Sequence, residues 1–276
     1  MNFTALFHHG QTLPLGQNFS RPQPKLKPNA PVALVFSPHP DDECIIGGLA
    51  LRLRREAGYR VVNIPVTLGS KVARRQTRLT ELTRACDALG FELEQLAPGG
   101  LERITLTTRA ENPAHWQTAV RATAALLWRH QPKIIFFPHV ADGHPTHIGT
   151  HWLVMDALVT LPASFRCTFA ETEFWGQMAT PNLLVESSVA DVTQLVGALA
   201  LHVGEVRRNP YHLRLPAWLM DNVRRGAELV GERGGKSPEF VFGTLYRVSS
   251  WANGNVADCK IHQPILSQAE TPKLPR

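Results

Sequence analysis

The sequence predicts an α/β protein in which a mostly parallel sheet lies between two layers of helices. Short apolar runs alternate with longer helical patterns through the first half of the chain, which is typical of βαβ units. Histidines and acidic residues directly follow two of these runs, as expected where parallel strands end. The chain has 276 residues, of which 43% are hydrophobic and 19% charged, so it can close one large core.

The first half repeats a strand followed by a helix. Strands are expected over residues 32–36, 60–67 and 133–137, and helices over residues 43–57, 71–89 and 113–130. Gly58 and Gly90 follow the first two helices, where glycine is a favoured terminator. Asn112-Pro113 gives the third helix a cap and a proline at its first position. Right-handed crossovers then place the loops after the strands along one sheet edge, which is a Rossmann-like three-layer αβα arrangement.

The second half is more mixed, and we expect one domain. Further strands are expected over residues 168–175, 183–186 and 239–248, and further helices beginning at Asp191 and Pro216. Residues 1–30 contain four prolines and predict an irregular arm. Residues 31–252 are expected to form the single domain, and residues 253–276 a loosely ordered tail.

The cellular setting is expected to be the cytoplasm. Four cysteines are scattered singly, which favours a reducing compartment: Cys44, Cys86, Cys167 and Cys259. No window reaches the ~18 apolar residues of a transmembrane helix, and the first residues lack the pattern of a signal peptide.

The formal net charge of +6 is concentrated in one segment. Residues 50–84 contain nine Lys or Arg and two Glu. Most of these residues, Arg52 included, fit the solvated face of a helix, whereas Lys71, Arg74 and Arg75 follow a strand and could meet an anionic substrate group. Few aromatic residues are interleaved, which argues against nucleic acid as a partner.

Two polar clusters follow the first strand and the strand at residues 133–137. The first reads SPHPDDE over residues 37–43, and the second, over residues 139–151, contains four histidines. Because parallel strands end at one sheet edge, we expect the two clusters to meet there.

The first cluster offers metal ligands and a proton acceptor. A catalytic zinc takes three protein ligands and leaves a position for water, whose pKa it lowers to about 7. His39 and Asp42 can supply two ligands from one turn, and a histidine of the second cluster the third. Asp41 is placed to take the proton of the water, and a protonated histidine nearby would stabilise the oxyanion of an attacked carbonyl.

These motifs resemble the PIG-L/LmbE-like family of zinc-dependent de-N-acetylases, the N-acetylglucosaminyl deacetylases. The resemblance rests on PHPDDE after a buried strand and HPTH after a later one, together with Thr67-Leu68-Gly69 and Arg78-x-x-Glu81 between them, and covers residues 32–161. It implies that the metal ligands are His39, Asp42 and His147 and that Asp41 is the general base. It also implies that His144 stabilises the tetrahedral intermediate and protonates the leaving amine.

Two positions depart from the family pattern. Where the family has HPDH, Thr146 replaces the second acid, so His144 would be less basic or Asp142 would orient it instead. Pro98-Gly99-Gly100 stands where the family often has an acidic residue that contacts sugar hydroxyls. Arg78 matches a family position that reaches substrate hydroxyls, and we expect it to bind substrate together with Asp142.

Two further residues are expected beside the site. Glu43 fits either an acid that favours the first turn of a helix or a group that hydrogen-bonds to the site. His151 lies one helical turn after His147, where we expect a supporting or structural residue, although the spacing also suits a ligand.

The expected activity is metal-dependent removal of an N-acetyl group from an N-acetylglucosamine-type amino sugar or related conjugate, with release of acetate. The expected cofactor is Zn2+, with Fe2+ or another divalent ion as alternatives. Two other functions stay open. The same ion could hydrolyse an ester or a non-sugar amide, or the chain could be an idle carbohydrate-binding relative, which Thr146 favours.

Overall fold

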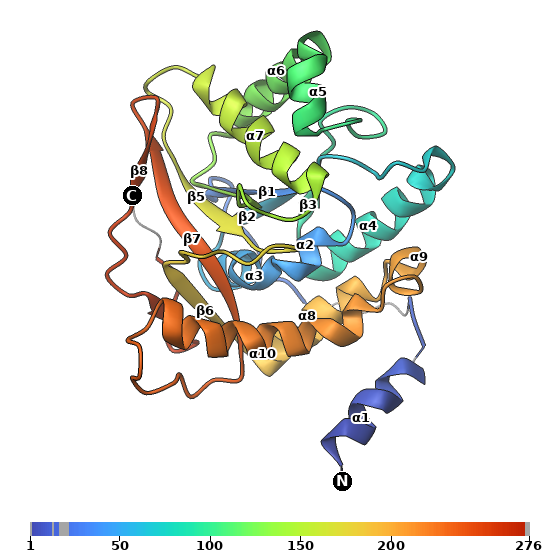
Figure 1. The fold of residues 1–276 in the computed structure, drawn as a ribbon, viewed down its shortest axis with the longest axis vertical. Helices are drawn as coiled ribbons and strands as arrows, with labels where there is room; N and C mark the ends of the chain where they lie inside the picture. Colours follow the sequence, from blue (N-terminus) through green and yellow to red (C-terminus); the bar gives the residue numbers. More distant parts are fainter. Residues whose placement is uncertain (1, 13, 17–21, 274–276) are drawn as a thin grey trace.

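A mixed sheet forms the centre of the protein (Figure 1). The computed structural model describes residues 2–12, 14–16 and 22–273. Within those residues the strands are β1 (Val32–Ser37), β2 (Arg60–Pro65), β3 (Glu92–Leu93), β4 (Ile134–Pro138), β5 (Cys167–Thr172), β6 (Leu183–Ser187), β7 (Phe242–Ala252), β8 (Asn255–Asp258) and β9 (Ile265–Leu266). Their order is β3-β2-β1-β4-β5-β7-β6-β9, and β8 pairs with β7. Strands β1 to β5 are mutually parallel, whereas β7 is antiparallel to β5, β6 and β8.

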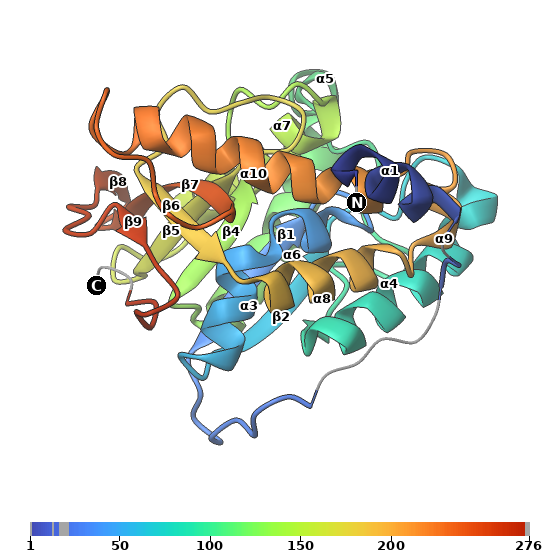
Figure 2. The same ribbon diagram turned by 90° about the horizontal axis from the view of Figure 1, so that it is seen from below.

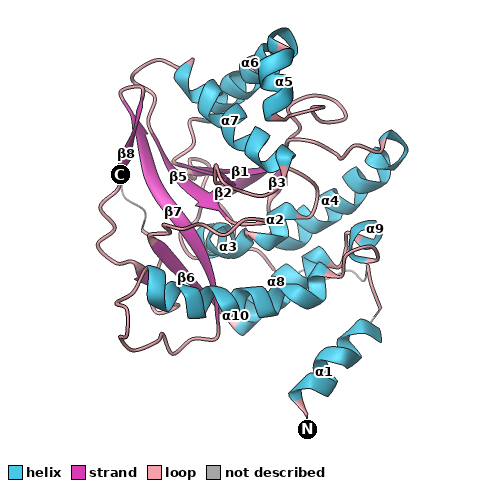
Figure 3. Cartoon of the chain, in the orientation of Figure 1, coloured by secondary structure: helices cyan, strands magenta, loops and turns pink. Residues whose placement is uncertain are grey.

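Helices cover both faces of the sheet (Figure 3). They are α1 (Phe3–His9), α2 (Asp42–Ile45), α3 (Gly47–Arg55), α4 (Arg75–Leu89), α5 (Leu106–Glu111), α6 (Pro113–His130), α7 (Pro145–Val159), α8 (Val189–Leu199), α9 (Val203–Val206) and α10 (Tyr211–Leu229). Helices α5, α6 and α7 lie over one face, and Figure 2 shows α3, α4, α8 and α10 over the other. The prediction of a three-layer, mostly parallel α/β fold is confirmed.

Strand β1 shows why both faces need covering. Ala33 and Val35 belong to the core beneath α3, α4 and α8, whereas Leu34 and Phe36 belong to the core beneath α6 and α7. Successive side chains of a strand point to opposite faces, so a continuous apolar run fills two cores at once.

The first half differs from the prediction at its helices. The helix expected over residues 43–57 is divided into α2 and α3 at Ile46, whose ψ of 1° is not helical. A Cβ on Gly47 would lie 2.6 Å from the end of the Leu195 side chain, so a larger residue there would require that leucine of α8 to move. Helix α4 begins at Arg75, after a short 3-10 turn, and α5 is a helix that the sequence did not predict.

The second half differs in where its elements begin and end. Ser188, not Asp191, caps α8, and the Asp191 side chain completes a capping box by accepting the Ser188 backbone N–H. Pro216 lies inside α10, which begins at Tyr211, so it does not open that helix. The last long strand, β7, covers residues 242–252, where we expected 239–248.

Both ends of the chain contain regular structure that we did not expect. Helix α1 lies in the arm predicted to be irregular, and β8 and β9 lie in the tail predicted to be loosely ordered. Residues 1, 13 and 17–21 of that arm and 274–276 of that tail lie outside the described residues. The domain boundaries themselves stay predictions.

Arg52 ties α3 to the C-terminal segment. Its side chain is buried, not solvated as predicted, and it donates hydrogen bonds to the carbonyl oxygens of Leu266, Ser267 and Glu270. It also pairs with the Glu56 carboxylate at 3.0 Å. A buried guanidinium needs such acceptors, so the last residues of the chain complete the core beneath α3.

None of the helices in the described part of the chain is long and apolar enough to cross a membrane. All four cysteines are free thiols, and three of them are buried.

Gly149 allows α7 to lie directly against the backbone of residue 104. A Cβ on Gly149 would lie 2.1 Å from the Ile104 carbonyl oxygen, and backbone cannot move aside as a flexible side chain can. We expect Gly149→Ala to lower the free energy of unfolding by roughly 1–3 kcal/mol, as overpacked sites do, despite the helix propensity of alanine. Urea unfolding checks this against Gly143→Ala, where the nearest atom to the added Cβ is 3.6 Å away. Equal losses in the two variants would contradict the packing argument.

Candidate active site

The carboxyl ends of four parallel strands meet at one edge of the sheet. The loop after β1 and the first turn of α2 carry His39 to Glu43, and the loop after β4 leads into α7. Thr67 follows β2 and Phe174 follows β5, and both line the same pocket as His39. The two polar clusters of the sequence therefore lie together.

The loop after β1 is held in an unusual backbone conformation. Asp41 has φ 107°, outside the region that residues with a side chain normally occupy. Ser37 Oγ donates to Asn63 Oδ1 at 2.6 Å, which joins the ends of β1 and β2. The Asp42 carboxylate accepts the backbone N–H of His39 at 2.8 Å, which closes the turn.

Three donor atoms from the two clusters form a small triangle. His39 Nδ1 lies 3.2 Å from His147 Nε2 and 3.5 Å from Asp42 Oδ2, and His147 Nε2 lies 3.4 Å from the same oxygen. Tetrahedral ligands at zinc bond lengths of 2.0–2.1 Å stand about 3.3 Å apart. The triangle therefore fits a metal ion without rearrangement.

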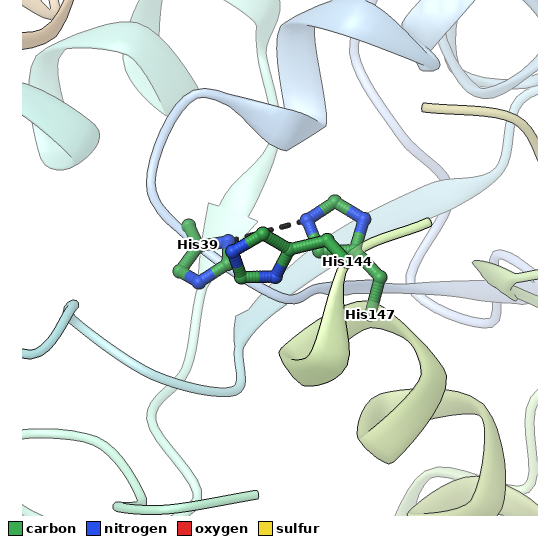
Figure 4. Close-up of side chains that lie close together, drawn as sticks. All are labelled: His39, His144 and His147. Atoms are coloured by element: carbon green, nitrogen blue, oxygen red, sulfur yellow. Dashed lines mark hydrogen bonds between the residues drawn. The ribbon is translucent and has the colours of Figure 1, made fainter. Parts of the chain in front are cut away.

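A second grouping replaces the carboxylate by a third histidine. The rings of His39, His144 and His147 converge (Figure 4), with ligand atoms within 4.8 Å of one another. The His144 ring is 5.0 Å from His39 and 5.1 Å from His147, centroid to centroid. The set with Asp42 is the one whose donor separations, 3.2 to 3.5 Å, match those of zinc ligands.

The histidines are held in the form that binds metals. Burial, and then the Arg78 charge, lowers the pKa of His39 to about 4, and burial, and then the His39 charge, lowers the pKa of His147 to about 2. Both imidazoles are therefore neutral at neutral pH, with a lone pair available. Burial, and then the Asp42 charge, raises the pKa of Asp41 well above its usual range. A cation beside the loop would favour the charged carboxylates and oppose that shift.

Helix α7 presents the histidines of the second cluster. Pro145 occupies its first turn and His144 caps it, with Nδ1 accepting the Thr146 backbone N–H at 3.2 Å. Because Nδ1 accepts, the proton of a neutral His144 is on Nε2. Burial, and then the charge of His39, lowers the pKa of His144, so this neutral tautomer is the one at neutral pH.

Asp142 lies behind the histidines. Its carboxylate accepts the backbone N–H groups of His144 at 3.0 Å and of Trp175 at 3.1 Å. His147 Nδ1 is buried without a hydrogen-bond partner among the described residues, and Asp142 Oδ1 lies 3.5 Å from it. Asp142 is 1% exposed and is not among the residues that line the pocket, and its contact with substrate stays a prediction. Its position suits orientation of both histidines.

The histidine donors open onto a pocket of about 700 Å³. One wall is aromatic: Trp175, 57% exposed, meets Tyr211 edge-on at 5.8 Å. Other residues that line the pocket are charged, and they include Arg75 and Arg78 of α4. The pocket thus offers both an apolar surface and cationic groups beside the donor triangle.

Residues 34–158 match a family model described as PIG-L, GlcNAc-PI de-N-acetylase. This segment is similar to the PIG-L family. It is 28% identical over 186 residues to the 1D-myo-inositol 2-acetamido-2-deoxy-alpha-D-glucopyranoside deacetylase of Thermobifida fusca, an alignment that covers 57% of this chain and 65% of that protein. The chain therefore spans less than two thirds of the length of this relative.

Solved structures share the fold of this chain at lower identity. The N,N'-diacetylchitobiose deacetylase of Pyrococcus horikoshii superposes with a TM-score of 0.57 at 16% identity, covering 89% of this chain and 91% of that one. GalB, the 4-carboxy-2-hydroxymuconate hydratase of Pseudomonas putida, also superposes with a TM-score of 0.57 at 16% identity, covering 79% and 95%. The fold alone thus occurs with more than one reaction.

The remaining predicted residues lie near the site but are held by other contacts. Arg78 lines the pocket, yet its guanidinium donates to the Pro40 carbonyl oxygen at 3.0 Å. Glu43 is fully buried and accepts a hydrogen bond from the Asp41 N–H. His151 Nδ1 donates to the Pro138 carbonyl oxygen at 3.0 Å, away from the donor triangle.

The sequence did not reveal the residues that reach the site from beyond the PIG-L segment. Trp175, Tyr211 and Glu205 line the pocket, and His202 pairs with Glu43. No motif marks them, because they come from separate loops and helices of the second half. Phe174 and Trp175 were predicted only as the end of a strand over residues 168–175, whereas β5 ends at Thr172 and both residues lie in the loop after it.

Proposed function

We propose that the chain is a metal-dependent hydrolase that removes the N-acetyl group of an N-acetylglucosamine-type amino sugar or conjugate and releases acetate. The proposal rests above all on the donor triangle at the base of the pocket, with Asp41 beside it. The match to the PIG-L model and the name of the Thermobifida relative support the amide and sugar parts of the substrate.

In this proposal, His39, Asp42 and His147 hold the ion. Two neutral imidazoles and one carboxylate suit Zn2+, and Fe2+ or another divalent ion accepts the same ligands. When bound, the ion would polarise the acyl carbonyl and acidify a water molecule. Asp142 would accept the Nδ1 proton of His147, fixing the tautomer that leaves Nε2 free to bind the ion.

The chain's own groups move the protons. Asp41 is 7% exposed and lines the pocket, where its carboxylate can accept the proton of the attacking water. His144 Nε2–H points to the donor cluster and can donate a hydrogen bond to the acyl oxygen as negative charge develops there. The proton that Asp41 takes from the water can then pass by way of His144 Nε2 to the departing amine, which returns both groups to their starting state.

The lining of the pocket supports a conjugate larger than one sugar. Trp175 and Tyr211 offer surface to the apolar face of a ring. Arg74 and Lys71 lie at an adjoining cavity of about 140 Å³, which supports an anionic group on the aglycone, as the charge of this segment suggested. The free thiols support the cytoplasm as the setting of the reaction.

A panel of acyl compounds tests the proposed reaction. Metal-loaded protein is expected to release acetate from N-acetylated amino sugars, with a product lighter by ~42 Da as acetyl is replaced by hydrogen, and a chelator is expected to abolish this release. The panel includes an acetate ester, a non-sugar acetamide and sugars with neutral and anionic aglycones. Faster turnover of the ester or of the non-sugar amide would overturn the proposed substrate. Tight sugar binding without any turnover would favour an idle binding relative.

A further inference from the structure

One peptide bond beside Asp41 is held at both of its polar atoms by charged side chains. The Pro40 carbonyl oxygen accepts from Arg78 Nη2 at 3.0 Å, and the N–H of Asp41 donates to Glu43 Oε2 at 3.0 Å. This peptide leads into the residue with φ 107°. A backbone held in so rare a conformation needs surrounding contacts that fix it.

The Glu43 end of this arrangement continues into a buried ion pair. Glu43 Oε1 lies 2.7 Å from His202 Nε2, and the two side chains are 0% and 1% exposed. An ionised carboxylate only accepts hydrogen bonds, so His202 is the donor. Glu43 also accepts from the Cys44 thiol at 3.2 Å, so both of its oxygens are engaged.

Arg78, which holds the Pro40 carbonyl oxygen, contacts the same short segment of chain as Glu43 does. Arg78 Nη2 lies 3.6 Å from Glu205 Oε2, and the Glu205 side chain is 6% exposed. His202 caps α9 and Glu205 lies within that helix, so one short turn contacts both groups that hold the peptide. This turn lies outside residues 34–158, the segment that matches the PIG-L model.

We propose that His202, acting through Glu43, is a positioning residue that fixes the Pro40-Asp41 peptide and so aims the Asp41 carboxylate into the pocket, with Glu205 and Arg78 holding the opposite end. The expected effect on kcat rests on the proposed function, because it needs Asp41 as the base. The fixing of the Pro40-Asp41 peptide by His202 and Glu43 does not depend on the proposed function. Without the donor on His202, the Glu43 carboxylate is freed to turn from the Asp41 amide, and the strained residue is able to relax.

Two measurements on the metal-loaded protein test the proposal. Hydrogen exchange at the Asp41 amide reports on its bond to Glu43 whatever reaction the protein performs. His202→Leu is expected to speed that exchange and to lower kcat about 10- to 100-fold, as removal of a supporting contact does, with KM and bound metal unchanged. His202→Gln keeps a donor amide at the same place. It is expected to restore most of kcat and most of the protection of the Asp41 amide against exchange.

Arg52→Met is the matched control, since it removes another buried charge that neither lines the pocket nor contacts the loop. It is expected to lower stability while leaving Asp41 exchange and kcat as they are. If His202→Leu does not fold, Glu43→Gln replaces it, because one carboxamide oxygen cannot serve both donors and the Asp41 amide should again exchange faster.

The outcomes separate the two proposals. Unchanged exchange at Asp41 in these variants overturns the positioning role, whether or not the protein is a deacetylase. Faster exchange with unchanged kcat also overturns it, because the peptide would then not aim the base. A wild-type protein that releases no acetate overturns the proposed function, while the exchange measurement still decides whether His202 fixes the peptide.

Discussion

An Asp41→Asn variant is expected to keep its metal ion and to lose about 10²- to 10⁴-fold in turnover, the usual contribution of a general base. The amide of asparagine cannot accept a proton at neutral pH, yet it has nearly the same shape as the carboxylate. Asparagine also tolerates positive φ better than most residues, so the turn at φ 107° should survive. The loss should therefore appear in kcat with little change in KM.

Metal analysis and steady-state kinetics on the same samples check this prediction. Asp156→Asn is a suitable control, because Asp156 pairs with Arg109 and Trp116 and lies outside the pocket. That variant should lose stability and keep kcat. If the activity of Asp41→Asn falls only in proportion to its loss of bound metal, Asp41 takes part in metal binding and not in proton transfer.

A His147→Ala variant is expected to lose metal affinity by more than about 100-fold. Removing a residue that only supports a ligand already costs up to about 100-fold, and removing the ligand itself should cost more. His147 Nε2 is one corner of the donor triangle, and its ring is completely buried. Alanine leaves two donors where three are needed, and activity should fall to background because the remaining site cannot retain the ion during dialysis.

His151→Ala is the matched control for this variant. It removes a histidine of the same helix, one turn later, that contacts Pro138 and Glu171 and not the triangle. Wild type and His151→Ala should be stabilised against heat by added Zn2+, since an ion that binds only the folded state raises Tm, whereas His147→Ala should not respond. Zinc-dependent stabilisation of His147→Ala equal to that of wild type would exclude it as a ligand.

The sequence predicted most of what depends on neighbouring residues. Continuous apolar runs gave the parallel strands, and the two motifs at their ends named His39, Asp42 and His147, which the structure brings within 3.5 Å of one another. Short motifs succeed here because a turn after a strand fixes the relative positions of the residues it contains. The division of the first helix at Ile46 was missed, since no proline or polar cap in the sequence marks it.

Contacts between distant segments were beyond reach of the sequence. Nothing in the sequence indicated that the Asp142 carboxylate accepts the backbone N–H of Trp175, 33 residues away. Similarly, Glu43 left two interpretations open until His202, 159 residues away, appeared beside it. Pairings of this kind depend on the path of the second half, which carries no recognisable motif.

The buried guanidinium of Arg52 bears on how the protein can be divided or joined to others. Three of its acceptors lie at residues 266–270, so an end placed at residue 252, where we expected the domain to stop, would leave this buried cation with only Glu56 and the Glu186 carbonyl oxygen as partners. We therefore expect the cooperative folding unit to extend at least to residue 270. Fusion partners and affinity tags belong after this point, and proteolytic trimming of the last segment should unfold the molecule instead of releasing a smaller enzyme.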